Sequence, residues 1–339
     1  MIGKGKIIIT YAIFLSCVCF SFTSFGQRTQ IRGFMDVLTG FQDDKVSFTL
    51  GEQDLFITSE LSDRFSFLGE SVFKFTPGTP TTFSVSIERA IVKYNFMGNH
   101  NLLIGKHHTP INYWNDTYHH GRVLFPTIYR PLLFEADIIP LHTTGVTLQG
   151  QNLGNLKFGY DVMVGNGLGS DDVLDNDKRK SITAAVHIKP AEGLRIGFSW
   201  YNDEMAAGSR THDGKLITWN VQQNLFSPSI AYFGNKIEVL AESTLATNHT
   251  DTTGSKQTFA GYIYAGLKIK ERLVPYIRFD RLHFQEGEIL FDKNNTTSIV
   301  GGIRYNINYL TVVKLEYQHE QTELDKNINK LTFQIAVGF

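Results

Sequence analysis

Apolar residues occupy every second position over long parts of this chain. The final segment, residues 331–339, is apolar at each odd position and polar or small at the positions between them. Period-two alternation is typical of a β-strand with one apolar face and one polar face. The same alternation recurs at residues 31–37, 65–75, 156–164, 194–201, 237–242, 259–269, 277–280, 298–307 and 309–318. The pattern therefore predicts an all-β chain.

The links between these segments alternate in length. Short links such as 62–63, 234–235 and 308 alternate with longer polar links such as 165–178 and 246–255. Counting the strands between the links gives about sixteen, and bacterial outer-membrane barrels combine an even strand number with short periplasmic turns and longer external loops. We therefore expect a transmembrane antiparallel β-barrel of about 16 strands with both chain ends in the periplasm.

A soluble β-sandwich or β-helix is the alternative fold. Its apolar face would pack against a second sheet, but here the opposite face carries charges on strand after strand. A transmembrane barrel needs an apolar lipid-facing side and accepts a polar interior. Its closure also removes the unpaired strand edges that lipid could not satisfy. The alternation therefore favours the barrel.

Residues 1–26 read as a secretory signal peptide, which would leave 27–339 as the outer-membrane β-barrel. Lys4 and Lys6 precede an apolar stretch that ends near residue 22, and small or polar residues follow it. An uncleaved anchor helix stays an alternative, although the stretch is short for a span of about 20 residues. A lipoprotein acylated in the leader is a further alternative, but the residues before its first cysteine match that signal poorly.

Composition narrows the function classes. Removal of the leader leaves 313 residues with 30 basic and 33 acidic side chains, a net charge of −3, which argues against nucleic-acid binding. No run of about 18 apolar residues follows the leader, so a bundle of transmembrane helices is excluded. Both cysteines, Cys17 and Cys19, lie in the leader. The mature chain is therefore expected to lack disulfides and thiolate metal sites.

The predicted strand number implies a channel, because barrels of sixteen to eighteen strands leave an aqueous lumen. The longest link, residues 107–141, is the third external loop and contains four prolines and many aromatic residues. We expect so apolar a loop to fold into the barrel and narrow the pore, by analogy with the inward-folding third loop of general porins. The pore-constriction candidates are Lys106, His107, His108, Tyr113, Trp114, Asp116, His119, His120, Arg122, Arg130 and Glu135.

Charged residues on the polar faces of the strands are of mixed sign. The lumen-lining candidates are Arg64, Glu70, Lys74, Lys157, Asp161, Arg195, Glu238, Glu242, Arg278, Asp280, Arg304, Lys314 and Glu316. We predict a channel for passive diffusion of small hydrophilic solutes, which discriminates them by size and charge at the third loop. The alternative is a non-transporting barrel that serves as a binding or secretion and assembly partner at the outer membrane.

Two stretches resemble a group of poorly characterised porin-like outer-membrane proteins. They are residues 51–64 with 67–70, and residues 104–115 with 118–121. The step Gly105-Lys106-His107-His108-Thr109-Pro110 is also similar to the phosphate-selective porin family. The resemblance implies a porin-like barrel. Phosphate specificity does not carry over, because the phosphate-selective members use basic ladders and the inward charges here are mixed.

The terminal Phe339 completes a strand with apolar alternate residues. This ending resembles the recognition signal of the barrel-assembly machinery, which is therefore an expected partner during biogenesis. The other expected partners are outer-membrane lipid and small hydrophilic solutes, and nucleic acid is not one. Porins of this size are often trimers, but no outward face shows a distinct subunit contact, so a homotrimer stays an open alternative.

Histidines are concentrated in and just after the long loop, at His107, His108, His119, His120 and His142. Three or four converging imidazoles could bind zinc or copper, but none of the spacings is a recognisable ligand motif. Pairing with carboxylates or backbone carbonyls is the alternative, and we expect no metal and no cofactor. The chain contains no Gly-x-Ser-x-Gly elbow and no His-Glu-x-x-His motif, so we expect no enzyme.

Overall fold

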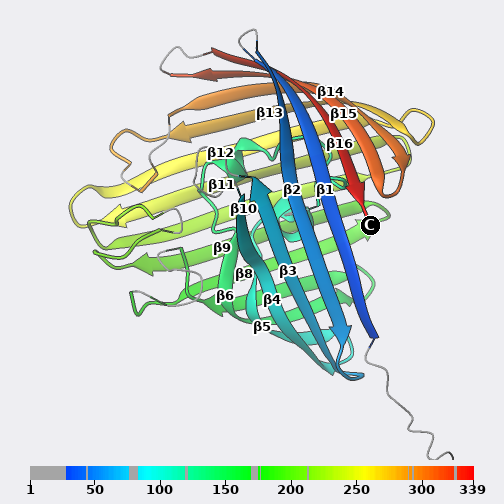
Figure 1. Cartoon of the computed structure of the whole chain (residues 1–339). Coiled ribbons are helices and arrows are strands. Elements are labelled where there is room, and N and C mark those ends of the chain that lie inside the picture. Colours follow the sequence, from blue (N-terminus) through cyan, green and yellow to red (C-terminus); the bar gives the residue numbers. More distant parts are fainter. Residues whose placement is uncertain are drawn as a thin grey trace, which may run out of the picture.

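The computed structural model describes residues 28–42, 45–75, 83–118, 121–168, 175, 177–211, 214–288, 290–291, 294–323 and 327–339. Sixteen antiparallel strands form a closed barrel in which each strand pairs with its sequence neighbours and β1 pairs with β16 (Figure 1). This confirms the predicted fold class and strand number. The predicted signal peptide, residues 1–26, lies outside the described residues.

The strand bounds are β1 Arg28–Gln42, β2 Lys45–Glu60, β3 Phe65–Phe75, β4 Phe83–Met97, β5 His100–His108, β6 His142–Leu153, β7 Phe158–Gly165, β8 Ser181–Ala191, β9 Leu194–Met205, β10 Val221–Phe233, β11 Ile237–Thr250, β12 Gly254–Leu267, β13 Leu273–Phe284, β14 Thr296–Asn308, β15 Thr311–Thr322 and β16 Asn327–Gly338. Two short helices, α2 Tyr113–Thr117 and α3 Leu132–Glu135, lie between β5 and β6. No helix in the described part of the chain is long and apolar enough to cross a bilayer.

Alternation along each strand separates an outer face from an inner face. On β16, Leu331 and Ile335 are exposed on the outside by 37% and 44%, whereas Gln334 and Ala336 on the inside are fully buried. The same division runs round the barrel because side chains on a strand point alternately to opposite faces. The outer face therefore presents apolar side chains suited to lipid.

The connections give the barrel two different ends. The turn end carries the links 61–64, 98–99, 154–157, 192–193, 234–236, 268–272 and 309–310. The link from β5 to β6, residues 109–141, starts from the opposite end, and we refer to this segment as the central loop. The predicted loop began two residues earlier, but His107 and His108 continue β5 in register with β6.

One predicted long link is instead mostly strand. Residues 246–255 were expected to form a polar loop, but β11 and β12 continue into them and leave only residues 251–253 between the strands. Thr244, Ala246 and Asn248 are all buried and keep the alternation of the strand. Polar residues on the inner face of a barrel extend a ladder as readily as apolar ones, so their polarity was misleading.

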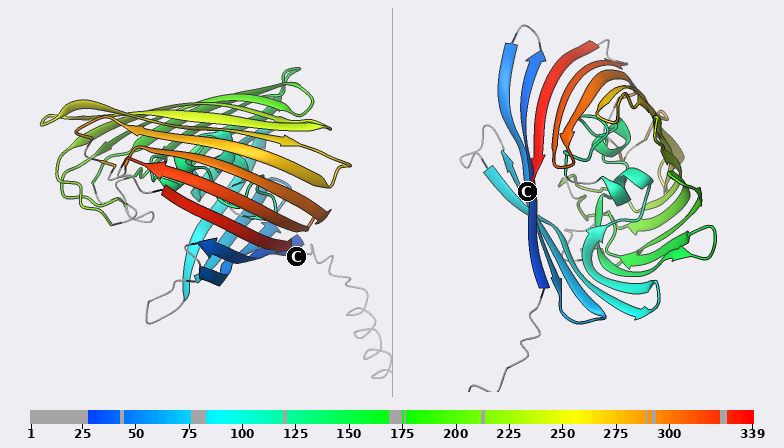
Figure 2. Two further views of the ribbon diagram at one scale, coloured as in Figure 1. Left: turned by 90° about the horizontal axis from the view of Figure 1, so that it is seen from above. Right: turned by 90° about the vertical axis from the view of Figure 1, so that its right-hand side faces the viewer.

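The central loop lies inside the ring of strands. Figure 2 shows both of its helices enclosed by the barrel wall. Helix α3 contacts β12 and β13, and helix α2 contacts β10. The loop therefore packs against the wall formed by the second half of the chain.

Candidate functional site

The two ends of the central loop lie close together where the loop leaves the barrel wall. Gly105 on β5 has a φ of 131°, and a Cβ atom there would lie 1.9 Å from the Ala90 carbonyl oxygen, so only glycine fits this close approach. Four residues later, the hydroxyls of Thr109 and Thr143 are 2.7 Å apart. The Asn115 amide donates to the carbonyl oxygens of Thr109 and of the loop's last residue, at 2.8 and 3.0 Å. These contacts fix both ends of the loop.

An apolar cluster holds the loop against one half of the barrel. Trp114 is 1% exposed, and its ring packs against those of Phe125, Phe134 and Tyr262 at centroid distances of 5.3, 6.1 and 6.1 Å. The cluster continues through buried loop and wall residues, which include Ile111, Leu132, Leu133, Ile138, Tyr201, Leu225, Leu240, Ala260 and Val300. The loop therefore fills the interior beside β9–β14.

Wall carboxylates accept hydrogen bonds from the backbone of the central loop. Glu242 accepts from the backbone N–H groups of Tyr113 and Trp114, and from the Tyr262 hydroxyl. Asp280 accepts from the N–H of Leu132 at 3.1 Å. Glu316 accepts from the N–H of Ile128 at 2.8 Å. Buried backbone donors need such partners, and hydrogen bonds to charged groups are stronger than those between neutral groups.

Wall cations donate to the loop carbonyls in the same way. The Arg278 guanidinium donates to the Thr127 hydroxyl and the Tyr129 carbonyl, both at 2.7 Å, and to Asp280 at 2.8 Å. Lys314 donates to the Arg122 and Thr127 carbonyls at 2.7 and 3.0 Å. The loop is thus fastened by charges of both signs, each of which finds a specific partner.

This arrangement changes the role predicted for the lumen-lining candidates. The seven candidates on β11 and β13–β15 face inward and are buried at 8% exposure or less; they are Glu238, Glu242, Arg278, Asp280, Arg304, Lys314 and Glu316. The structure places these side chains against the loop or in pairs with one another, as in the 2.8 Å bond from Arg304 to Glu238. They therefore do not line an open passage, because the loop covers the wall on which they stand.

Two further candidates are corrected by their position. Arg64 lies in the turn after β2, and Lys157 lies in the turn after β6. Both are exposed at the turn end of the barrel, outside the strands whose alternation was used to place them. Residues beside a turn do not keep the alternation of the strand. An odd or even position in the sequence therefore does not tell which way these two side chains point.

The remaining candidates keep inward positions on strands. Glu70 is buried and paired with Arg89. Asp161 is buried and accepts a 2.7 Å hydrogen bond from Gln149. Lys74 and Arg195 are also on the inner face and are partly exposed. Lys74 and Arg195 belong to two separate groups of charged side chains, and each group is described below.

A chain of alternating charges crosses the inner face of β1–β4, on the side away from the apolar cluster. Arg122, from the central loop, lies 3.8 Å from Asp36 on β1 and 3.4 Å from Glu52 on β2. Lys74 on β3 is the next charged residue of the chain. Its ammonium lies 3.6 Å from Glu52 and 3.8 Å from Glu88. We refer to Asp36, Arg122, Glu52, Lys74 and Glu88 as the charge chain.

The charge chain is only partly covered. The side chains of Lys74 and Arg122 are 41% and 20% exposed. Its last carboxylate, Glu88, lies 3.3 Å from Nδ1 of His142. This exposure contrasts with the buried wall charges under the loop, so the charge chain is one place where the described interior offers charges to a solute.

The described histidines of the predicted constriction are not grouped as metal ligands. His107 is buried, and its Nε2 lies 3.0 Å from the Thr147 hydroxyl. The ring of His108 lies beside that of His142, with centroids 5.4 Å apart. In the described residues, no group of three or more potential ligands is arranged to hold a metal ion. His119 and His120 lie outside the described residues.

The other constriction candidates are spread over the loop. Tyr113 and Trp114 belong to the apolar cluster, and Asp116 pairs with Arg195 at 2.9 Å. Arg122 belongs to the charge chain, and Arg130 is half-buried in the central loop. The backbone carbonyl of Arg130 accepts a hydrogen bond from Arg278 at 3.3 Å.

The prediction for Lys106 is wrong. On β5 it pairs with the exposed Ala90 and shares the parity of Ile104, which is 49% exposed on the outer face, whereas the adjacent His107 is buried inside.

Three acidic members of the charge chain were not among the predicted residues. Asp36 could have been found, because residues 31–37 place apolar side chains outward at odd positions and Asp36 is even. Glu52 lies in a stretch that was noted only for its family resemblance. Glu88 lies opposite an irregularity in the pairing of β3 with β4, and such irregularities break the parity rule.

Glu135, the last constriction candidate, is exposed within the barrel at the end of α3. Although the side chain is accessible within the lumen, the protein around it partly desolvates the carboxyl and raises its pKa to about 7, with Arg278 opposing the rise and Asp280 adding to it. Acidification from about pH 8 to about pH 6 therefore removes most of this negative charge. We expect the cation-to-anion permeability ratio to fall over this range, as measured by reversal potentials in a salt gradient. Glu135→Gln should make that fall smaller, and an equally large fall in the variant would contradict the assignment.

Comparisons with known proteins place this geometry among outer-membrane barrels. No protein-family model matches the chain, and no curated protein matches its sequence. The resemblance to the phosphate-selective porins therefore stays a prediction.

Solved structures do match. An anion-selective porin from Comamonas acidovorans has a TM-score of 0.67 and 10% identity over 92% of this chain and 100% of its own. The outer-membrane channel DcaP of Acinetobacter baumannii has a TM-score of 0.63 and 13% identity over 94% and 99%. The in-vitro folded trimer form of OmpT, an outer-membrane protein of Vibrio cholerae, has a TM-score of 0.65 and 13% identity over 92% and 99%. The chain thus shares the sixteen-stranded barrel fold of outer-membrane porins.

Proposed function

We propose that this protein is an outer-membrane channel for passive diffusion of small hydrophilic solutes, narrowed by the central loop. One observation carries the proposal: the longest described link of a sixteen-stranded barrel lies inside the barrel, where its apolar packing is concentrated on β9–β14 and smaller contacts reach β1, β2, β15 and β16. A sixteen-stranded barrel is wide enough for an aqueous lumen. We place the passage on the side away from the apolar cluster, along the partly exposed charge chain.

The charges at the proposed passage indicate the kind of selectivity. The charge chain contains three carboxylates and two cations, and rings or rows of charged side chains set the ion preference of pores. A mixed row with partly exposed cations suits polar solutes of either sign and gives only a modest preference between cations and anions. The names of the matched Comamonas and Acinetobacter proteins, a porin and a channel, support transport as the function.

The proposal includes the bacterial outer membrane as the location and no catalytic role. The signal peptide and the assembly signal at Phe339 belong to it as predictions from sequence. Phe339 pairs through its backbone with Gly33 at 2.8 and 2.9 Å, which closes the seam of the barrel. The matched Vibrio protein has a trimer form, and we extend the proposal to a homotrimer on that likeness.

A single cysteine can test whether solutes pass the charge chain, because residues 27–339 contain no native cysteine. In Lys74→Cys, modification by a bulky, water-soluble thiol reagent should lower the single-channel conductance in planar bilayers by about half or more. The reason is that the added group stands on the partly exposed member of the chain, beside the proposed passage.

Lys236→Cys provides the matched control, since Lys236 is exposed to water in the turn between β10 and β11, away from the charge chain. Modification there should leave the conductance unchanged. A modified Lys74→Cys channel with unaltered conductance would show that the passage does not run along the charge chain.

A second candidate is a non-transporting barrel that acts as a binding or assembly partner. The buried apolar cluster favours it, because the cluster fills much of the interior beside β9–β14. Liposome swelling separates the two functions. A channel admits small sugars and amino acids and the liposomes swell, whereas a plugged barrel admits neither.

A further inference from the structure

A second polar region lies on the other side of the interior from the charge chain. It is a cavity of about 570 Å³ at the turn end of the barrel, between helix α2 and strands β6–β10. Its rim includes the turn residues Lys157, Glu192 and Gly193. Binding pockets for small molecules are typically about 300–1,000 Å³. The cavity is therefore large enough for a small organic solute, and it shares no residue with the charge chain.

One wall of this cavity is cationic. It is lined by Lys157, Lys189 and Arg195, against the carboxylates of Asp116 and Glu192. Asp116 is already engaged, since it lies 2.9 Å from Arg195. Neither lysine has a carboxylate within ion-pair distance among the described residues, and the ammonium of Lys189 donates only to an amide oxygen, at 3.1 Å. The wall therefore carries positive charge that the described protein does not neutralise.

His187 supports Arg195 in the same wall. It is 5% exposed and lines the cavity. Arg195 lies 3.2 Å from Nδ1 of His187, and because a guanidinium only donates, Nδ1 must accept and the proton lies on Nε2. No described residue accepts a hydrogen bond from this Nε2. This Nε2 has almost no accessible surface and packs over Gly159 on β7, so the ring belongs to the wall and its role is to hold the Arg195 guanidinium.

The facing wall is aromatic. Tyr113, Tyr118 and Phe233 line the cavity, and the three rings pack together with centroid distances of 5.7 to 6.2 Å. The guanidinium of Arg195 stands 5.1 Å from the centre of the Tyr113 ring. Aromatic faces bind flat apolar groups and the ring faces of sugars, while the cations opposite bind an anionic group.

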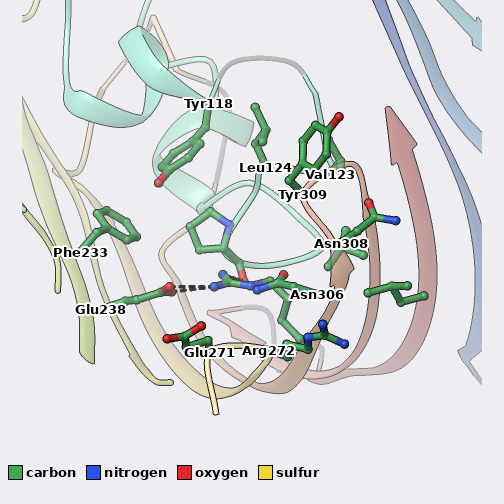
Figure 3. Close-up of a pocket in the computed structure, with 14 residues that line it drawn as sticks. Tyr118, Val123, Leu124, Phe233, Glu238, Glu271, Arg272, Asn306, Asn308 and Tyr309 are labelled. Atoms are coloured by element: carbon green, nitrogen blue, oxygen red, sulfur yellow. Dashed lines mark hydrogen bonds and ion pairs between the residues drawn. The ribbon is translucent and has the colours of Figure 1, made fainter. Parts of the chain in front are cut away.

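A neighbouring cavity offers the contrast. Figure 3 shows this cavity, of about 610 Å³, which shares Tyr118 and Phe233 with the first. Its charged groups are balanced, because Arg304 is bound to Glu238 at 2.8 Å and Arg272 stands beside Glu271. The two cavities thus share two aromatic lining residues, but the charged side chains that line them differ in net charge.

We propose that the cationic cavity binds a small solute that carries a carboxylate or phosphate on a ring-shaped body. Lys157 and Lys189 bind the anionic group, and Tyr113 and Phe233 pack against the ring. An aromatic carboxylate and a sugar phosphate share this chemistry. The site rests on the proposed function only for the route by which the solute arrives.

Equilibrium binding to the full-length protein in detergent tests the site without a membrane. The probes are benzoate and glucose 6-phosphate, with benzamide and glucose as their neutral counterparts, and the measurement is titration calorimetry. We expect at least one anionic probe to bind more tightly than its neutral counterpart. The double variant Lys157→Gln/Lys189→Gln should weaken it by about tenfold or more, because two charged hydrogen-bond partners are lost.

Arg272→Gln is the matched control, since it removes one cation from the neighbouring cavity of balanced charge. It should leave the binding of the anionic probe unchanged. The proposal is overturned if neither anion binds, if the double variant binds as tightly as the parent, or if Arg272→Gln weakens binding equally. Heat-modifiable migration on gels verifies that each variant is folded. A channel that conducts but binds neither anion would refute the site alone.

Discussion

Replacing Arg278 by methionine should destabilise the folded barrel by about 3–5 kcal/mol, the range found when one partner of a buried ion pair is removed. Arg278 is 1% exposed, and its guanidinium satisfies Asp280 together with three acceptors on the central loop. Methionine fills similar volume but donates no hydrogen bond. The variant therefore leaves the buried Asp280 carboxylate without its counter-charge and removes one hydrogen bond from each of three acceptors on the loop.

The measurement is thermal unfolding of the purified protein in detergent, followed by far-ultraviolet circular dichroism. Arg281→Met is the control, because Arg281 lies on the same strand but is exposed. Substitutions of exposed residues usually change stability by no more than about 0.5 kcal/mol. A midpoint for Arg278→Met that matches the control would contradict the view that wall charges fasten the loop.

The barrel itself follows closely from sequence. Alternation of apolar and polar residues at 331–339 and in the preceding segments predicts which side chains of each strand point outward. The alternation of short and long links predicts the number of strands. The prediction of a long loop at residues 246–255 was wrong, because these residues are polar yet extend β11 and β12. Alternation reports which face a side chain occupies, whereas polarity alone does not distinguish a loop from the inner face of a barrel.

The inside of the barrel could not be predicted in the same way. Charged residues on the inner faces were expected to line water, but Glu316 accepts from the N–H of Ile128, a residue 188 positions away in the sequence. Lys314 likewise donates to the carbonyl of Arg122. Such contacts depend on how one loop packs in three dimensions. They leave no periodic or local signal, so the same charges are compatible with an open or a filled interior.

Replacing Trp114 by alanine should release the central loop and raise the conductance of the channel. The indole is 1% exposed and packs against four aromatic rings, including those of Tyr118 and Tyr262. Truncation of a buried aromatic side chain costs about 3–5 kcal/mol, because apolar contacts are lost and a cavity remains. The strand ladder is untouched, so this cost is borne mainly by the packing of the loop inside the barrel.

Single-channel recording in planar bilayers and thermal unfolding should therefore change together in Trp114→Ala. Trp219→Ala is the matched control, since Trp219 is 43% exposed between β9 and β10, and it should leave both measurements near those of the parent protein. A Trp114→Ala barrel that is less stable but conducts as before would show that the loop does not limit the passage. Higher conductance in that variant alone would mean that the apolar cluster holds the loop where it narrows the lumen. The charge chain would then form the wall opposite the constriction.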